Sequence, residues 1–180
     1  MNIFRKNFNF LLILAILALG IFLRSYHFSD WLHFELDQSR DAKIIDLAVK
    51  EGPGNLPLLG PKAAGSFLRL GPIFYYFNYL SALIFGNSPS GIAMLIMILG
   101  ILAMPAFYFL ARRYFNEWIS IALLLIFSVS LFLVMYSRFS WNPNPLPLFG
   151  ILTFYSILRV VDSEEKKKGI WIVLAAFFLS

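Results

Sequence analysis

The residues of this sequence best suited to chemistry lie in a charged, helix-forming stretch from Glu35 to Ile45. Asp37, Arg40 and Asp41, here called the acid–arginine cluster, share one helical turn in a chain that is 59% hydrophobic and only 14% charged. A carboxylate in apolar surroundings is a stronger base, because burial disfavours its charged form, and an arginine beside it can bind phosphate. The same residues could instead stabilise the start of a helix, with Asp37 as its cap, and the two roles are compatible.

The composition places the chain among membrane proteins. Its mean hydropathy is +0.74 and 18% of its residues are aromatic. The formal net charge of +5 does not indicate a nucleic-acid partner, because the basic residues lie at the ends of apolar runs, where membrane topology explains them. The chain has no cysteine, which excludes disulfides, a thiolate nucleophile and a cysteine-based metal site.

Several apolar runs approach the roughly 20 residues that a helix needs to cross the hydrocarbon of a bilayer. We predict spans at about residues 8–24, 91–111, 118–136 and 145–161, and an incomplete one at 169–180. The first run follows Arg5 and Lys6, as in a signal peptide, but it continues through Leu23, beyond a passable cleavage site. We therefore expect an uncleaved helix, and residues 1–180 to be the N-terminal part of a single transmembrane domain.

The basic residues predict how the chain is oriented in the cell membrane. The clusters expected in the cytoplasm are Arg5–Lys6, Arg112–Arg113 and Arg159 with Lys166–Lys168. The N-terminus of a multi-pass protein is then cytoplasmic, and residues 25–90 form an extracytoplasmic loop. Residues 71–86 are apolar enough to cross, but their three tyrosines and Asn78 favour a helix at the interface. The charged run from Asp162 to Lys168 is expected to be a solvated cytoplasmic loop.

The long outer loop contains a predicted surface helix and then a glycine- and proline-rich segment. An apolar stripe at three- and four-residue spacing predicts a helix over Ser39 to Glu51 that lies along the membrane, with the acid–arginine cluster at its N-terminal end. Between Gly52 and Pro72, glycine and proline exclude regular helix. Lys62 and Arg69 in that segment could bind an anionic substrate group or, equally well, lipid phosphates.

A second outer loop, Tyr136 to Pro147, gathers polar and aromatic residues between two predicted spans. Tryptophan and tyrosine at a membrane interface are ordinarily anchors. Arg138 and Asn142 are harder to explain in this way, because either would be costly if it faced lipid. We therefore count both as candidate substrate-binding residues.

Four features of the chain can now be combined. They are one N-terminal span, Asp37-Gln-Ser-Arg-Asp-Ala opening a surface helix, Gly71-Pro72-Ile-Phe-Tyr-Tyr followed by Phe85-Gly86-Asn87-Ser88, and Tyr136-Ser-Arg-Phe-Ser-Trp-Asn-Pro-Asn-Pro. The combination resembles the C-type-fold glycosyltransferases that use lipid-linked sugars, which include the dolichyl-phosphate-mannose protein mannosyltransferases (glycosyltransferase family 39) and the aminoarabinose transferases. This resemblance covers nearly the whole chain. It implies an all-α, multi-span membrane bundle with interfacial helices in its first extracytoplasmic loop.

The resemblance also implies an activity. In that family the acidic residue of the first outward loop is the proposed catalytic base, and the matching position here is Asp37. The reaction would transfer a hexosyl or pentosyl group, with inversion, from a polyprenyl-phosphate carrier to an acceptor hydroxyl on the outer face. The candidate substrate-binding residues are Arg40, Asp41, Arg69, Arg138 and Asn142, with the arginines stabilising the departing phosphate. The expected partners are the lipid bilayer and the lipid-linked donor, while the acceptor is left open.

The chain departs from the family pattern at two positions. Many members have an acidic pair where this chain has Asp37-Gln38, so a divalent metal held by such a pair is an open question and no metal ligand is assigned. Many also carry an aspartate near the start of the span after the second outer loop, where this chain has Asn142 or Asn144. The later spans that complete the carrier cavity in the family lie outside this sequence, which leaves open whether these residues alone are active.

Two other classes of protein fit part of the pattern. A transporter fragment would place ionisable residues within its spans, whereas these spans are nearly without charge and the polar groups gather on one face. A non-catalytic membrane subunit would be favoured if Asp37 faced lipid, or were buried against an arginine with no cavity beside it. For the enzyme we expect Asp37 and Arg138 to approach one outward-facing cavity.

Overall fold

The computed structural model of the protein describes residues 2–62, 66–162 and 165–179, and all of its regular structure is helical apart from one isolated bridge, between Lys62 and Arg69. The elements are α1 (Asn2–Ser25), α2 (Leu36–Glu51), the 3-10 turn η1 (Pro53–Asn55), α3 (Ile73–Phe85), α4 (Pro89–Tyr114), α5 (Glu117–Val129), α6 (Leu131–Tyr136), α7 (Leu146–Asp162) and α8 (Glu165–Leu179). The all-α prediction is confirmed for this part of the chain.

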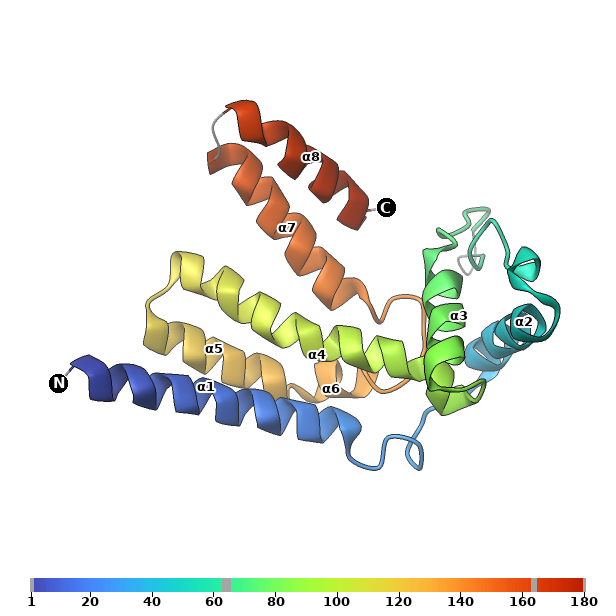
Figure 1. The fold of residues 1–180 in the computed structure, drawn as a ribbon, viewed down its shortest axis with the longest axis horizontal. Helices are drawn as coiled ribbons and strands as arrows, with labels where there is room; N and C mark the ends of the chain where they lie inside the picture. Colours follow the sequence, from blue (N-terminus) through green and yellow to red (C-terminus); the bar gives the residue numbers. More distant parts are fainter. Residues whose placement is uncertain (1, 63–65, 163–164, 180) are drawn as a thin grey trace.

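The long axis of the molecule is formed by α1, α4 and α5, which lie side by side (Figure 1). Their contact is a small apolar core of Ile16, Met104, Ile121 and Leu124. A Cβ at Gly20 would collide with the Met104 side chain, so this glycine permits the close approach of α1 to α4. α4 begins at a serine cap, because the Ser88 hydroxyl accepts a hydrogen bond from the Gly91 N–H at 3.1 Å.

Two helices in the described part of the chain are long and apolar enough to cross a membrane, α1 from Asn7 to Ser25 and α4. Only 22% of the most apolar window of α1 and 33% of that of α4 are buried, whereas the core helix of a soluble protein would be mostly buried. Large side chains such as Leu11 (63% exposed) and Phe109 (67% exposed) cover their outer faces. Such continuous apolar surface indicates lipid as the surrounding solvent.

The apolar run predicted as one span at residues 118–136 is divided at Ser130 into α5 and α6. Ser130 has φ −55° and ψ 117°, which leaves the helical region and exposes carbonyl groups of the last turn of α5. The buried Arg24 at the end of α1 satisfies one of them, because its Nη1 donates to the Ser128 carbonyl at 2.9 Å and to the Gly20 carbonyl at 3.0 Å. A side chain of the neighbouring helix α1 therefore satisfies a carbonyl that the helix break leaves free.

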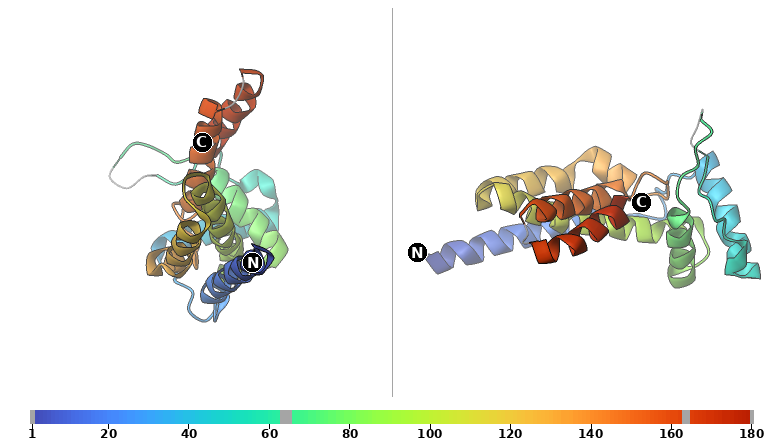
Figure 2. Two further views of the ribbon diagram at one scale, coloured as in Figure 1. Left: turned by 90° about the vertical axis from the view of Figure 1, so that its left-hand side faces the viewer. Right: turned by 90° about the horizontal axis from the view of Figure 1, so that it is seen from above.

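At the opposite end from the N-terminus, α3 crosses the start of α4 and α2 packs beside α3 (Figures 1 and 2). The Ser81 hydroxyl donates to the Gly91 carbonyl at 2.6 Å and accepts from the Leu95 N–H at 3.0 Å, which fixes α3 on α4. The apolar core at this end consists of Ile45, Phe74, Tyr75, Ala82, Ile92 and Ile96. With 13 residues, α3 is roughly 20 Å long, less than the hydrocarbon thickness.

α7 and α8 form a helical pair that leans away from the other helices, with α7 contacting α4 (Figure 1). An ion pair between Arg113 and Asp162 joins the ends of α4 and α7. The solvated loop predicted from Asp162 to Lys168 falls partly on residues 163–164, and the incomplete span predicted at 169–180 ends on residue 180. These three positions lie outside the described residues.

Candidate active site

The helix that carries the acid–arginine cluster begins earlier than predicted, at Leu36. Glu35 occupies the cap position in an extended conformation, and its backbone N–H donates to the side-chain oxygen of Gln38 at 3.0 Å. The cap is therefore Glu35, and the alternative in which Asp37 caps the helix is excluded. Asp37 lies in the first turn, where the helix dipole favours a carboxylate.

Arg40 lies between the two carboxylates of the cluster. Its Nη1 donates to Asp37 Oδ1 at 2.9 Å, and its Nε and Nη2 lie 2.8 Å from Asp41 Oδ1. The side chains of Asp37 and Arg40 are 51% and 46% exposed, whereas that of Asp41 is 3% exposed. Two carboxylates share one guanidinium, so the cluster has one net negative charge and an accessible face.

Asp41 is the buried member of the cluster. Its Oδ1 also accepts a hydrogen bond from the Tyr75 hydroxyl of α3 at 3.3 Å, while its Oδ2 is buried without a hydrogen-bond partner among the described residues. Burial raises the pKa of Asp41 above its ordinary value, although the bonds from Arg40 and Tyr75 oppose this. Burial would lower the pKa of Arg40, but the hydrogen bond to Asp41 and the two carboxylate charges raise it.

A small pocket lies beside Asp41, and its wall includes His33, Gln38 and Ser140. The Ser140 hydroxyl donates to Oδ1 of the fully buried Asn78 of α3 at 2.8 Å. The second outer loop thus reaches the pocket beside Asp41 through Ser140, a residue that the sequence does not single out. In the sequence Tyr75 and Asn78 are polar residues of a predicted interfacial helix, and a helical projection of 73–85 places Asn78 on the same face as Phe74 and Tyr75.

Arg138 holds the end of α1. Its Nη1 donates to the carbonyls of Leu23 and Arg24 at 2.9 and 3.0 Å, and its Nη2 donates to those of Tyr26 and His27 at 2.8 and 3.1 Å. These bonds account for all four N–H groups of the two terminal nitrogens and leave Nε–H. Burial lowers the pKa of Arg138.

Arg138 also lines an open groove of about 310 Å³, together with Trp31, His33, Met135, Tyr136 and Phe139. Asp37 is not among the residues lining that groove. His33 is, and it also lines the small pocket beside Asp41, so the two spaces adjoin. The structure thus connects Arg138 with Asp41 through His33, while Asp37 stands on the exposed side of α2.

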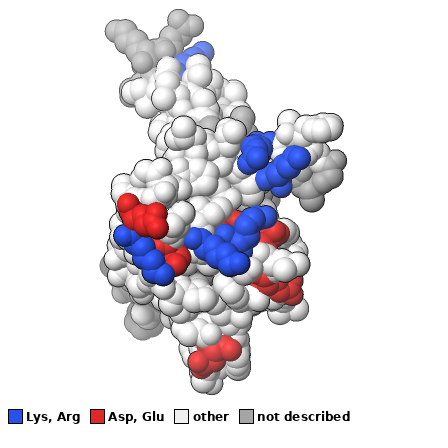
Figure 3. Space-filling view, turned by 90° about the vertical axis from the view of Figure 1, so that its right-hand side faces the viewer, with Lys and Arg blue, Asp and Glu red and all other residues white. Residues whose placement is uncertain are grey.

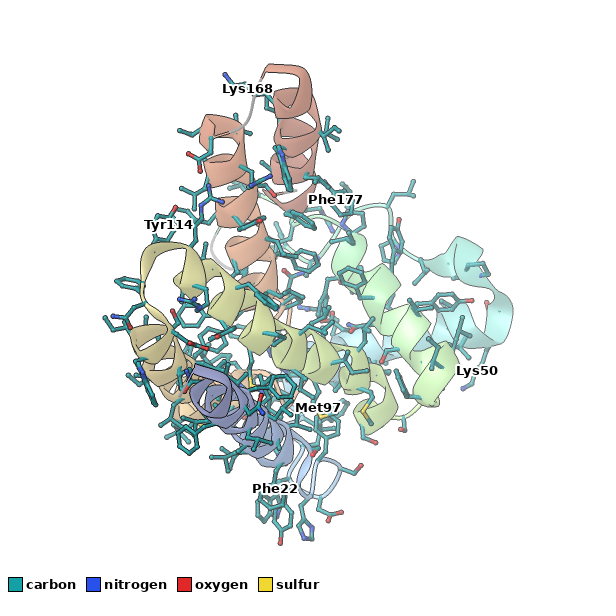
Figure 4. All side chains as sticks on the ribbon, turned by 60° about the vertical axis from the view of Figure 1, so that its left-hand side comes forward. Phe22, Lys50, Met97, Tyr114, Lys168 and Phe177 are labelled. Carbon is teal, nitrogen blue, oxygen red and sulfur yellow. The ribbon has the colours of Figure 1, made fainter. Side chains whose placement is uncertain are left out.

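Asn142 and Arg69 lie elsewhere. Asn142 lines an apolar pocket of about 180 Å³ between α3, α7 and α8. Phe177 of α8, which is labelled in Figure 4, also lines this pocket. Arg69 lies in the connection between α2 and α3, opposite Lys62. Among the described residues, no hydrogen bond or ion pair joins Asn142, Arg69 or Arg138 to the acid–arginine cluster. Of the predicted set, the structure brings together Asp37, Arg40 and Asp41.

Charged side chains of both signs gather over the end of the molecule formed by α2 and α3 (Figure 3). In the part of the chain that the structure describes, no group of three or more histidine, aspartate or glutamate side chains could hold a metal ion. Arg40 offsets one of the two carboxylate charges of the cluster, and its remaining N–H groups are suited to binding a phosphate while the exposed carboxylate is suited to accepting a proton.

The sequence profile described as dolichyl-phosphate-mannose-protein mannosyltransferase matches residues 69–179, which include α3 to α8 and therefore more than half of the chain. The acid–arginine cluster precedes the matched region. No curated protein and no solved structure matches the chain. The protein belongs to the dolichyl-phosphate-mannose-protein mannosyltransferase family.

Proposed function

We propose that this protein transfers a sugar from a polyprenyl-phosphate carrier to an acceptor hydroxyl at the extracytoplasmic face of the membrane, with Asp37 as general base. The family implies a glycosyltransferase with a lipid-linked donor in a membrane. The observation that carries the assignment to Asp37 is the acid–arginine cluster itself, which combines an accessible carboxylate with an accessible guanidinium.

The proposed topology has a cytoplasmic N-terminus, with α1, α4, the α5–α6 pair and α7 crossing the bilayer. The start of α1, the α4–α5 connection and the last turn of α7 lie toward one end of the molecule, whereas α2 and α3 lie at the other (Figure 1). The first end carries Arg112 and Arg113, as the positive-inside rule requires of a cytoplasmic end. The cluster then lies at the outer surface.

The reaction would proceed in one displacement. The Asp37 carboxylate accepts the proton of the acceptor hydroxyl as its oxygen forms a bond to the anomeric carbon. The bond from that carbon to the carrier phosphate breaks, and the electron pair leaves with the phosphate. The contacts to Asp37 and Asp41 engage three of the five N–H bonds of Arg40, so two remain for the departing phosphate.

Asp41 would act as a positioning residue. Its buried carboxylate, held by Tyr75, fixes Arg40 beside Asp37. Arg69, Arg138 and Asn142 keep their proposed substrate-binding roles as separate elements of a larger surface, Arg138 through its Nε–H and the groove that it lines. The condition that would favour a non-catalytic subunit, Asp37 buried against an arginine with no cavity beside it, is fulfilled only in part. Asp37 is half-exposed, but it lines neither the pocket beside Asp41 nor the groove beside Arg138.

The test is transfer of a radiolabelled sugar from its polyprenyl phosphate by the reconstituted protein carrying Asp37→Asn. Loss of a general base lowers turnover by about 100-fold or more. Asp46→Asn is the matched control, because Asp46 lies on the same helix, is 43% exposed and also pairs with a cation, Lys50 at 2.7 Å. Wild-type turnover in the Asp37 variant would refute the proposal.

A further inference from the structure

The connection between α2 and α3 folds back on itself, and we call its two described arms, residues 56–62 and 66–70, the α2–α3 hairpin. The Gly60 N–H donates to the Leu70 carbonyl at 2.9 Å, and the Leu70 N–H donates to the Pro61 carbonyl at 3.0 Å. A Cβ at Gly60 would collide with the backbone of Leu70 and Gly71, so glycine permits this close approach. The arms hold Lys62 opposite Arg69.

The hairpin exposes apolar side chains to an unusual degree. Phe67 is 99% exposed, Leu58 83% and Leu68 72%. An isolated exposed leucine needs no explanation, but three large apolar side chains on one short hairpin indicate a surface that is covered by something apolar.

The same hairpin carries two exposed cations. Lys62 and Arg69 lie across the bridge from each other, and the Lys62 Nζ is 5.9 Å from the centre of the Phe67 ring. Among the described residues, neither cation forms an ion pair with a carboxylate. Two neighbouring positive charges beside exposed apolar groups are complementary to an anionic head group with its acyl chains.

The position of the hairpin in the fold is also suited to contact with membrane phospholipids. It leaves the molecule at the end where α3 lies, and its arms extend sideways from the helices rather than along their axes (Figure 2). If α1 and α4 cross the bilayer as proposed above, this places the hairpin at the level of the outer head groups, beside the protein.

We propose that the α2–α3 hairpin is a lipid anchor, in which Lys62 and Arg69 bind the phosphates of anionic phospholipids while Leu58, Phe67 and Leu68 enter the outer leaflet. This interaction rests on the proposed topology but not on the proposed catalytic role of Asp37. It would fix the loop that follows α2 to the membrane surface, and thereby hold the acid–arginine cluster close to a donor that is itself lipid-bound.

The experiment uses the absence of cysteine from this chain. The Phe67 side chain is 99% exposed, so its replacement should disturb the fold little. The Phe67→Cys variant is labelled with the fluorophore NBD and reconstituted into liposomes of phosphatidylcholine with or without phosphatidylglycerol, in the absence of polyprenyl phosphate. Asn55→Cys, an exposed polar position in the same connection, is the matched control. We expect blue-shifted emission at position 67, with strong quenching by lipids brominated on their acyl chains, and water-like emission at position 55.

Head-group binding is measured by brominating only one of the two lipids. Quenching at position 67 should show a several-fold preference for phosphatidylglycerol, and Lys62→Gln with Arg69→Gln should reduce it to nearly none. Water-like emission at position 67 would overturn the proposal. Blue-shifted emission that brominated lipids do not quench would also overturn it, because a protein segment and not lipid would then cover this position. The proposal would likewise be overturned by equal quenching by both lipids, or by an anionic preference that arises only after polyprenyl phosphate is added. These fluorescence and quenching measurements do not depend on the activity of the Asp37→Asn variant, so the lipid-anchor proposal and the catalytic proposal can fail separately.

Discussion

Arg138 and Arg40 lie in two regions at the same end of the molecule and use the same chemical group in different ways. At the end of α1, Arg138 donates to four backbone carbonyls. At the start of α2, Arg40 bonds two carboxylates and retains exposed N–H groups. The difference indicates that the fold engages four of the five N–H groups of Arg138 and leaves only Nε–H, whereas it positions Arg40 and leaves two N–H groups available to a ligand.

The surroundings of the two arginines explain the difference. The carbonyls at a helix end have no intrahelical partner, so a neighbouring cation is bound firmly by them whatever else is present. The half-exposed Asp37 carboxylate is solvated without the arginine, so its pairing with Arg40 leaves room for exchange with another anion, while the buried Asp41 holds the guanidinium in place. Substitution of each arginine should therefore affect a different property of the protein.

The largest effect on stability is expected for Arg138→Ala. Removal of the guanidinium takes the donor from the carbonyls of Leu23, Arg24 and Tyr26, whereas the His27 carbonyl keeps the Trp31 N–H at 3.1 Å. Hydrogen bonds to a charged group are worth about 1.5–3 kcal/mol each when fully buried, so a total of about 3 kcal/mol is expected for this partly exposed site. Unfolding in a mixed-micelle denaturant titration measures it. Arg112→Ala is the control, because Arg112 donates to one carbonyl, that of Phe115. If stability were unchanged while sugar transfer was lost, Arg138 would be a ligand-binding residue like Arg40.

For Arg40→Ala we expect the reverse result. Sugar transfer should fall about 10- to 100-fold, which corresponds to roughly 1.4–2.7 kcal/mol in the transition state, because the phosphate loses its cation. Stability should fall by less than in the Arg138 variant, because the ion pair with Asp37 is exposed and the buried Asp41 carboxylate, once it has lost its cation, can be neutralised by taking up a proton. Arg40→Lys should recover part of the activity, since lysine supplies charge without the planar donor geometry. A protein that is destabilised as much as the Arg138 variant would show that both arginines are structural.

The contrast between these regions was only partly predictable from the sequence. Helical periodicity and charge placed Asp37, Arg40 and Asp41 on one turn, because contacts three and four residues apart are local. The bonds of Arg138 join residues more than 110 positions apart. The hydrogen-bonding groups of a polar side chain near lipid can be satisfied by a ligand or by the free carbonyls of a helix end, and sequence alone does not distinguish these two partners.

The same limit applies to the break at Ser130 and to the role of Ser140. An uninterrupted apolar run predicts a continuous helix, and nothing local in the run signals that Arg24 will bond the Ser128 carbonyl from another helix. Ser140 lies in a loop with no periodicity, so its contact with Asn78 depends on how α3 crosses α4. The predicted helices and the local cluster were accessible to sequence reasoning, whereas the contacts that orient them were not.

Asp41 provides a smaller and pH-dependent test of the comparison. Its folded pKa is raised by burial, so the folded state binds a proton more tightly than the unfolded chain, and this residue's contribution to stability decreases as pH rises from the ordinary carboxyl range through the folded pKa. Asp41→Asn, which resembles the protonated form, removes that dependence. The stability of the variant relative to wild type should therefore increase with rising pH in parallel denaturant titrations. An opposite slope would show that the pair with Arg40 dominates over burial.

The smallest expected effect concerns the link between the second outer loop and the cluster. Ser140→Ala removes the donor to Asn78 Oδ1 and leaves that buried amide with no hydrogen bond from its side chain among the described residues, at a cost of about 1 kcal/mol. Ser90→Ala, which removes an exposed hydroxyl near the start of α4, serves as the control. Because Ser140 and Asp41 line the same small pocket, hydrogen exchange should increase in the loop at 137–145 and at the start of α2 together. Faster exchange in the loop alone would mean that the Arg138 region and the Arg40 region are independent, and that the two arginines differ only in their immediate partners.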